Sequence, residues 1–136
     1  MTWLAILISI LLFVPAALHL LWAIGAWVPI RDEAALARAT VGAPGITRMP
    51  GPIPCALVFV ALSFAAALPH LTSFPLRTPL LVAIATVLGL RGLAAYLAAW
   101  RKLVPEEPFA TLDQRLYGPL CLVLGASFLL FTLTGT

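Results

Sequence analysis

The segment from Trp3 to Val28 is a long apolar run that contains no acidic side chain, no lysine and no arginine. About 20 apolar residues in helical conformation cross the hydrocarbon core of a bilayer, which is about 30 Å thick. The run is longer than the apolar region of about 7–15 residues in a cleavable secretory signal, and Met1-Thr2 supplies no basic segment before it. We therefore expect this run to be a true transmembrane helix.

Three more apolar runs follow, from Ile53 to about Phe74, from Pro79 to Trp100 and from Leu116 to Leu133. The chain is 62% hydrophobic and 10% charged, whereas soluble domains are about 45–50% apolar and about 25% charged. Backbone amides in lipid must be paired within the segment, which favours helices. We predict a single integral membrane domain over residues 1–136, an all-α, four-transmembrane-helix up-down bundle.

The first connection, from Pro29 to Pro52, is rich in proline and glycine. Within it, Asp32 and Glu33 precede an Ala/Leu run and Gly42 follows it, a pattern typical of the start and end of a helix. We predict a short interfacial helix in this loop.

The distribution of Lys and Arg predicts the orientation of the chain. The first and third connections hold six bases between them and the second holds one, so the positive-inside rule places the first and third in the cytoplasm. Both termini are then expected outside. The bases are scattered rather than clustered among aromatic residues, so we expect no nucleic-acid partner. These bases are Arg31, Arg38, Arg48, Arg101, Lys102 and Arg115, against Arg77.

Two ionisable side chains, His19 and Arg91, lie well inside the predicted spans, and all five acids lie in the first and third connections. Charged groups inside a bilayer usually face the bundle interior and have a partner. Each of the two residues is nine positions from its expected cytoplasmic end, Val28 or Trp100, which is about 13 Å along a helix. We expect them at similar depth, with Asp113 as the partner of Arg91.

The neighbours of both residues favour close helix packing. Pro15, Ala16 and Ala23 share a face with His19 and Trp22, and small residues let helices approach in lipid. Pro15 is expected to kink the helix beside His19. In the third span, a stripe of small residues predicts tight packing against a neighbour: Ala85, Gly89, Gly92 and Ala99.

The segment before the fourth span is the richest in side-chain chemistry. Thr111 and Gln114 have the spacing of a capping box. Asp113 and Tyr117 are four residues apart and share a helical face, while Arg115 points elsewhere. Together with the span residues they form the predicted ligand-binding set: His19, Trp22, Arg91, Asp113, Arg115 and Tyr117. The alternative is structural, with His19 joining helices, Arg91 clamping the fourth span and Tyr117 at the membrane interface.

Cysteine usage indicates no redox or metal site. Cys55 and Cys121 are far apart and form no CxxC pair. No cluster of metal-ligating residues is visible, so we expect no metal and no cofactor.

Several short motifs resemble a known family. They are His19-x-x-Trp22-x-x-Gly25, Met49-Pro50, Leu90-Arg91-Gly92, and Pro108-Phe109-x-x-x-Asp113-x-Arg115-x-Tyr117-x-Pro119-Leu120. In this order they resemble small bacterial four-span membrane proteins catalogued as a domain of unknown function. The resemblance covers nearly the whole chain and implies a multi-pass protein of the bacterial inner membrane. It brings no activity to transfer.

Three functions remain open. The first is binding or transport of a small or amphiphilic molecule at a polar and aromatic site in the cytoplasmic half of the bundle, with transport expected to need a homo-oligomer. The second is a membrane enzyme acting on a lipid-soluble, isoprenoid-like substrate with His19 as general acid or base. The third is a non-catalytic assembly partner of another membrane protein. Binding predicts a cavity lined by His19, Trp22 and Arg91; an assembly partner predicts that helices fill this space.

Overall fold

The computed structural model describes residues 1–135, and within them it is helical with no strand. Four segments are long and apolar enough to cross a membrane, which confirms the predicted fold class. They are α1 (Thr2–Ala23), α3 (Pro52–Ala67) continued by the 3₁₀ turn η1 (Leu68–His70), α4 (Arg77–Ala94), and a last segment made of α6 (Phe109–Leu112), the π-helical turn η2 (Asp113–Tyr117) and α7 (Gly118–Thr134). Two short helices, α2 (Glu33–Thr40) and α5 (Ala98–Leu103), lie in the connections.

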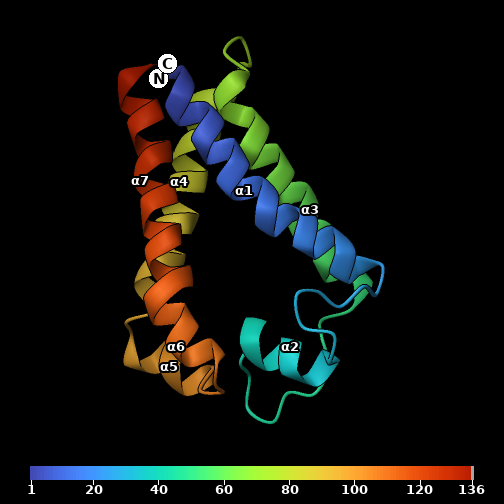
Figure 1. Cartoon of the computed structure of the whole chain (residues 1–136). Helices are drawn as coiled ribbons and strands as arrows, with labels where there is room; N and C mark the ends of the chain where they lie inside the picture. The colour runs from blue at the N-terminus through green and yellow to red at the C-terminus, as the bar shows by residue number, and fades with distance from the viewer. Residues whose placement is uncertain (136) are drawn as a thin grey trace.

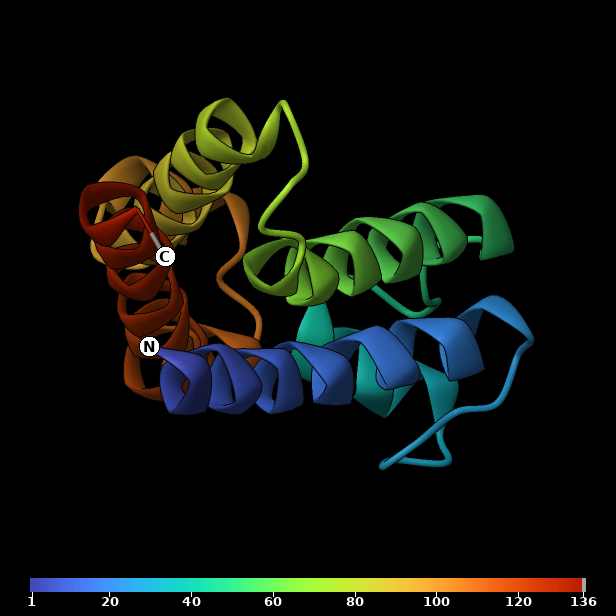
Figure 2. The same cartoon turned by 90° about the horizontal axis from the view of Figure 1, so that it is seen from above.

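The four long helices form two antiparallel pairs, α1 with α3 and α4 with α7. The pairs meet at the end that carries both chain termini, here called the terminal end, and diverge toward the opposite end, called the α2 end (Figures 1 and 2). The up-down order predicted from the sequence is confirmed, but the bundle is a wedge that widens toward α2.

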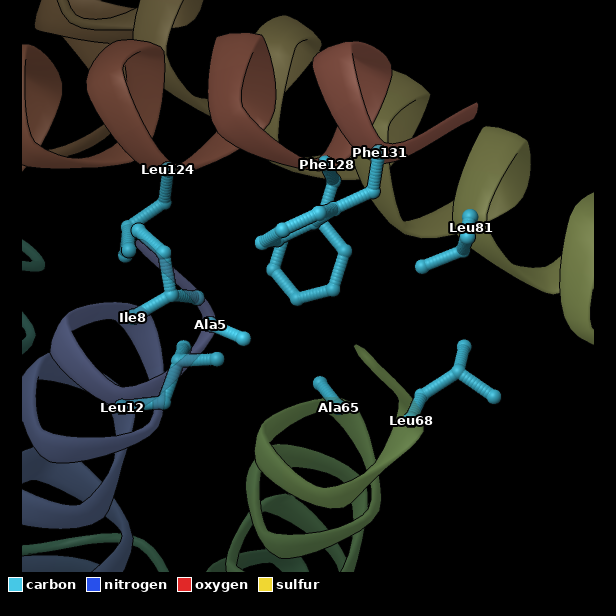
Figure 3. Close-up of a cluster of buried hydrophobic side chains, with 9 residues drawn as sticks. All are labelled: Ala5, Ile8, Leu12, Ala65, Leu68, Leu81, Leu124, Phe128 and Phe131. Carbon is cyan, nitrogen blue, oxygen red and sulfur yellow. The ribbon is translucent and has the colours of Figure 1, made fainter. Parts of the chain in front are cut away.

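A cluster of buried apolar side chains joins the two pairs at the terminal end (Figure 3). Ile8 and Leu12 of α1 pack there with Phe128 and Phe131 of α7, and Leu81 of α4 completes the contact. All five are essentially inaccessible to solvent. This core fixes the vertex of the wedge.

The α4–α7 pair is close because small residues face each other. A Cβ atom on Gly92 would lie 2.8 Å from the backbone oxygen of Gly118, and one on Gly125 would lie 3.1 Å from that of Ala85. The predicted small-residue stripe is confirmed for its α4 members. Ala99 was wrongly assigned to it, because Ala99 lies on α5 and is exposed.

The first transmembrane helix is shorter than predicted, ending at Ala23 instead of Val28. Gly25 adopts a left-handed conformation with φ of 80°. Its amide donates to the carbonyl of Trp22 (3.1 Å), and the next amide donates to the carbonyl five residues before it (2.8 Å). This pairing is a Schellman motif, which satisfies the last carbonyls of a helix and stops it.

Spans two and three also end earlier than predicted. Span two ends at His70 instead of about Phe74, in the η1 turn that contains Pro69. Span three ends at Ala94 instead of Trp100, and the chain turns back through α5.

The fourth span begins earlier than predicted, at Phe109 instead of Leu116. The wide turn η2 lies within it, just before Pro119, which has no amide to donate to the carbonyl of Arg115. The predicted capping box at Thr111 is wrong. Both the amide and the hydroxyl of Thr111 donate to the carboxylate of Glu107, at 3.1 and 2.9 Å, so the acid caps this turn.

The predicted helix in the first connection is confirmed as α2. Asp32 caps it by accepting the amide of Ala35 at 2.8 Å, and Gly42 follows it with φ of 71°. The Gly42 carbonyl accepts the amide of Glu106 at 3.0 Å. This bond ties the α2 connection to the connection before α6, so α2 bridges the open side of the wedge.

Candidate functional site

A cavity of about 440 Å³ lies between the diverging helix pairs. Its walls come from α1, α4 and α7, with Leu62 from α3, and residues of α2 and α6 line it at the α2 end. This volume is within the range of about 300–1,000 Å³ that is typical of small-molecule sites. Most of the lining is apolar, and the polar side chains are few: His19, Thr40, Arg91, Tyr117 and Cys121.

His19 lines this cavity, and its two ring nitrogens differ in their hydrogen bonding. Its Nδ1 lies 2.7 Å from the carbonyl oxygen of Pro15. Because a carbonyl only accepts, Nδ1 carries the proton and donates, and Nε2 has no hydrogen-bond partner among residues 1–135. The ring packs on Trp22 with centroids 4.8 Å apart, and the Trp22 indole donates to the carbonyl of Val28 at 2.8 Å. His19 is therefore held in one orientation.

The predicted ion pair between Arg91 and Asp113 is confirmed, with Nη2 of the arginine 2.6 Å from Oδ1 of the acid. Trp100 donates from its indole nitrogen to Oδ2 at 2.9 Å. The Arg91 guanidinium also lies over the Trp100 ring, 4.9 Å from its centroid. Asp113 and Trp100 together fix the position of the Arg91 guanidinium.

The second terminal nitrogen of Arg91, Nη1, has no hydrogen-bond partner among residues 1–135 although the atom is buried. Buried polar groups are nearly always paired, and an orphan in a native structure calls for an explanation. Arg91 is one of the residues that line the cavity.

Asp113 is 2% exposed and lies inside the fourth apolar helical segment. The expectation that every acid lies in a loop is therefore wrong. The carboxylate is accommodated there because both of its oxygens accept charge-assisted or indole hydrogen bonds. Asp113 begins the π-helical turn η2, and such turns occur frequently at functional sites.

Four of the six predicted site residues line the cavity together, namely His19, Trp22, Arg91 and Tyr117. Asp113 contributes through its bond to Arg91. Arg115, in contrast, is exposed and is not part of the cavity wall.

Tyr117 has a second role at the site. Its hydroxyl donates to the carbonyl of Ala39 at 2.9 Å, and its ring packs on Phe109 with centroids 5.7 Å apart. Tyr117 therefore joins α2 to the α4–α7 pair. Thr40 and Phe109 were missed as wall residues, because no pattern in the sequence shows that α2 folds back under the cavity.

His19 and Arg91 lie at similar levels relative to their helix ends, as predicted, but closer to those ends than predicted. Each is about one helical turn from the end of α1 or α4, because both helices are shorter than the apolar runs. The polar groups thus gather in the wide part of the wedge.

Across residues 1–135, no three His, Cys, Asp or Glu side chains gather in a group that would hold a metal ion. No curated protein and no solved structure matches the chain. A family model described as a protein of unknown function (DUF3995) matches residues 12–128, which include every transmembrane segment at least in part and all the polar residues of the cavity. The four apolar helices indicate a multi-pass membrane protein, and the chain belongs to the DUF3995 family.

Proposed function

We propose that this protein binds a small or amphiphilic molecule in the cavity between its two helix pairs. The observation that carries the proposal is the combination of an apolar cavity of about 440 Å³ with two unpaired nitrogens, Arg91 Nη1 and His19 Nε2. Apolar walls with a few placed polar groups are the usual composition of a ligand site. The protein resides in the bacterial inner membrane with the α2 end in the cytoplasm, and transport would use a homo-oligomer.

The cavity also bears on the alternatives. An assembly partner needs no cavity at His19 and Arg91, so the cavity argues for a ligand. An enzyme acting on an isoprenoid-like substrate is the second candidate, because His19 lines the cavity and its bond to Pro15 leaves Nε2 as the unprotonated nitrogen of a general base. That candidate is rejected if His19→Ala leaves the turnover of an identified substrate unchanged.

The experiment is to identify what co-purifies with the protein. Protein purified in a neutral detergent is extracted with organic solvent, and the extract is compared by mass spectrometry with that of Cys121→Phe, which places a ring in the cavity. Ala126→Phe is the matched control, because Ala126 lies on the same helix but is exposed and outside the cavity.

We expect a compound that is retained by the wild-type protein and by Ala126→Phe, and depleted at least tenfold in Cys121→Phe. Identical extracts from all three proteins would contradict the proposal.

A further inference from the structure

A second, fully apolar groove opens beside the cavity. It has a volume of about 220 Å³ and lies between α3 and α4, with Ala61 of α3 and Ala83 of α4 among its lining residues. Leu12, Leu62 and Leu88 line both the groove and the cavity. The two spaces are therefore neighbours separated only by aliphatic side chains.

The groove faces the bilayer at mid-helix. α4 contacts η1 at the terminal end, and α3 and α4 diverge away from that end, as Figure 1 shows. Ala61, Ala83 and Val87 are exposed there, and in a transmembrane segment exposed apolar atoms contact lipid chains. A hydrocarbon chain that leaves the cavity by this route would meet only apolar side chains.

The charges around the cavity select the headgroup. Asp113 already neutralises Arg91, so the one further positive charge that the cavity lining can offer is an imidazolium at His19. Arg91 Nη1 then offers its two N–H groups, and the imidazolium offers the N–H at Nε2. One positive charge and these N–H donors match a headgroup that has a single negative charge and two oxygens. The second negative charge of a phosphate monoester would have no positive charge to balance it.

We propose that the ligand is a single-chain amphiphile with a monoanionic oxyanion headgroup, a long-chain carboxylate. The headgroup binds Arg91 and His19, and the chain passes Leu12 and Leu88 into the groove between α3 and α4. This inference rests on the proposed function and specifies its ligand. Leu12 is about 10 Å from His19 along α1, so a short chain stays within the cavity and a long chain reaches the groove.

The test uses three probes in a neutral detergent, with binding measured by native mass spectrometry: palmitate, hexadecanol and octanoate. Hexadecanol has the chain of palmitate without its charge, and octanoate has the headgroup without the long chain. Ala61→Phe and Ala83→Phe obstruct the groove from exposed positions, so they replace no side chain of the buried core. Ala126→Phe adds the same ring on another lipid-facing surface, and Arg91→Lys keeps the charge beside Asp113 but removes Nη1.

We expect one palmitate per chain and at least tenfold weaker binding of hexadecanol. Ala61→Phe and Ala83→Phe should weaken palmitate at least fivefold and leave octanoate unchanged, Ala126→Phe should change neither, and Arg91→Lys should weaken both carboxylates.

Equal binding of hexadecanol and palmitate would overturn the inference that the bound headgroup is anionic. Unchanged palmitate binding in both groove variants would overturn the inference that the hydrocarbon chain lies in the groove between α3 and α4. If no probe binds but a co-purified compound is lost in Cys121→Phe, the inference fails and the proposed function stands. If neither is found, both fail.

Discussion

The ion pair between Arg91 and Asp113 predicts a measurable loss of stability when one charge is removed. Asp113→Asn keeps the size of the side chain and an oxygen that accepts from Trp100, but it leaves Arg91 without a counter-charge. Removing one partner of a buried pair costs about 3–5 kcal/mol. Because the Arg91 side chain is 30% exposed, we expect the lower end of that range, about 3 kcal/mol.

The assay is a double-mutant cycle with Arg91→Gln. The free energy of unfolding is measured by SDS titration in mixed micelles and followed by tryptophan fluorescence. The double variant carries two neutral amides, so it should be more stable than the sum of the single effects predicts, with a coupling energy of about 2 kcal/mol. Glu107→Gln is the control, because it removes an exposed charge and retains an acceptor for Thr111; we expect a change within about 0.5 kcal/mol.

Additivity of the two single effects to within about 0.5 kcal/mol would refute the reasoning. The ion pair between Arg91 and Asp113 would then add no stability beyond that of two separately solvated charged groups.

Three more outcomes follow from the structure. Gly42→Ala should destabilise α2 by at least about 1 kcal/mol more than Gly45→Ala, and we expect to see this as faster proteolysis of the first connection. Both glycines have positive φ. Only the Cβ added at Gly42 would clash with Phe109, because it would lie 2.6 Å from the Cγ atom of Phe109. Equal rates would contradict this. Gly92→Ala should lower the free energy of unfolding by about 1–3 kcal/mol. Gly89→Ala, with no described atom within 4 Å of its Cβ, should raise the free energy of unfolding by about 0.5–1 kcal/mol. If both variants were destabilised, close packing at Gly92 would not be the cause. An alkaline phosphatase fused to the C-terminus should be active and one in the first connection inactive, and the reverse would show the opposite orientation.

The partner of Arg91 could be predicted because a charge in lipid needs a counter-charge and few acids were near. The geometry of that pair could not. The apolar run after Ala94 favours continuing the helix, yet the chain turns so that Trp100 reaches Asp113. Here a tertiary contact with a buried carboxylate outweighs the local preference.

The end of α1 shows a different kind of miss. Hydropathy continues to Val28, but Gly25 is a helix stop signal that an apolar run conceals. The α2 helix was correctly predicted because Asp32 and Gly42 mark its two ends in a polar loop, where such signals are visible.

The cavity itself could be predicted only through the residues that line it. His19 and Arg91 were identified from their cost in lipid, and the structure brings them to one cavity with Trp22. The divergence of the two pairs depends on the packing of all four helices at the terminal end, which no single segment specifies.

The pairing of the helices has a consequence for biogenesis. α1 packs on α3, and α4 on α7, so each long helix associates chiefly with its neighbour in the transmembrane order. Such low contact order favours rapid folding, and each hairpin can assemble as soon as its second helix has been inserted. The cavity needs walls from both hairpins together with the α2 bridge. The proposed ligand binding would therefore be the last property that the nascent chain acquires, and only the completed protein would be stabilised by a ligand.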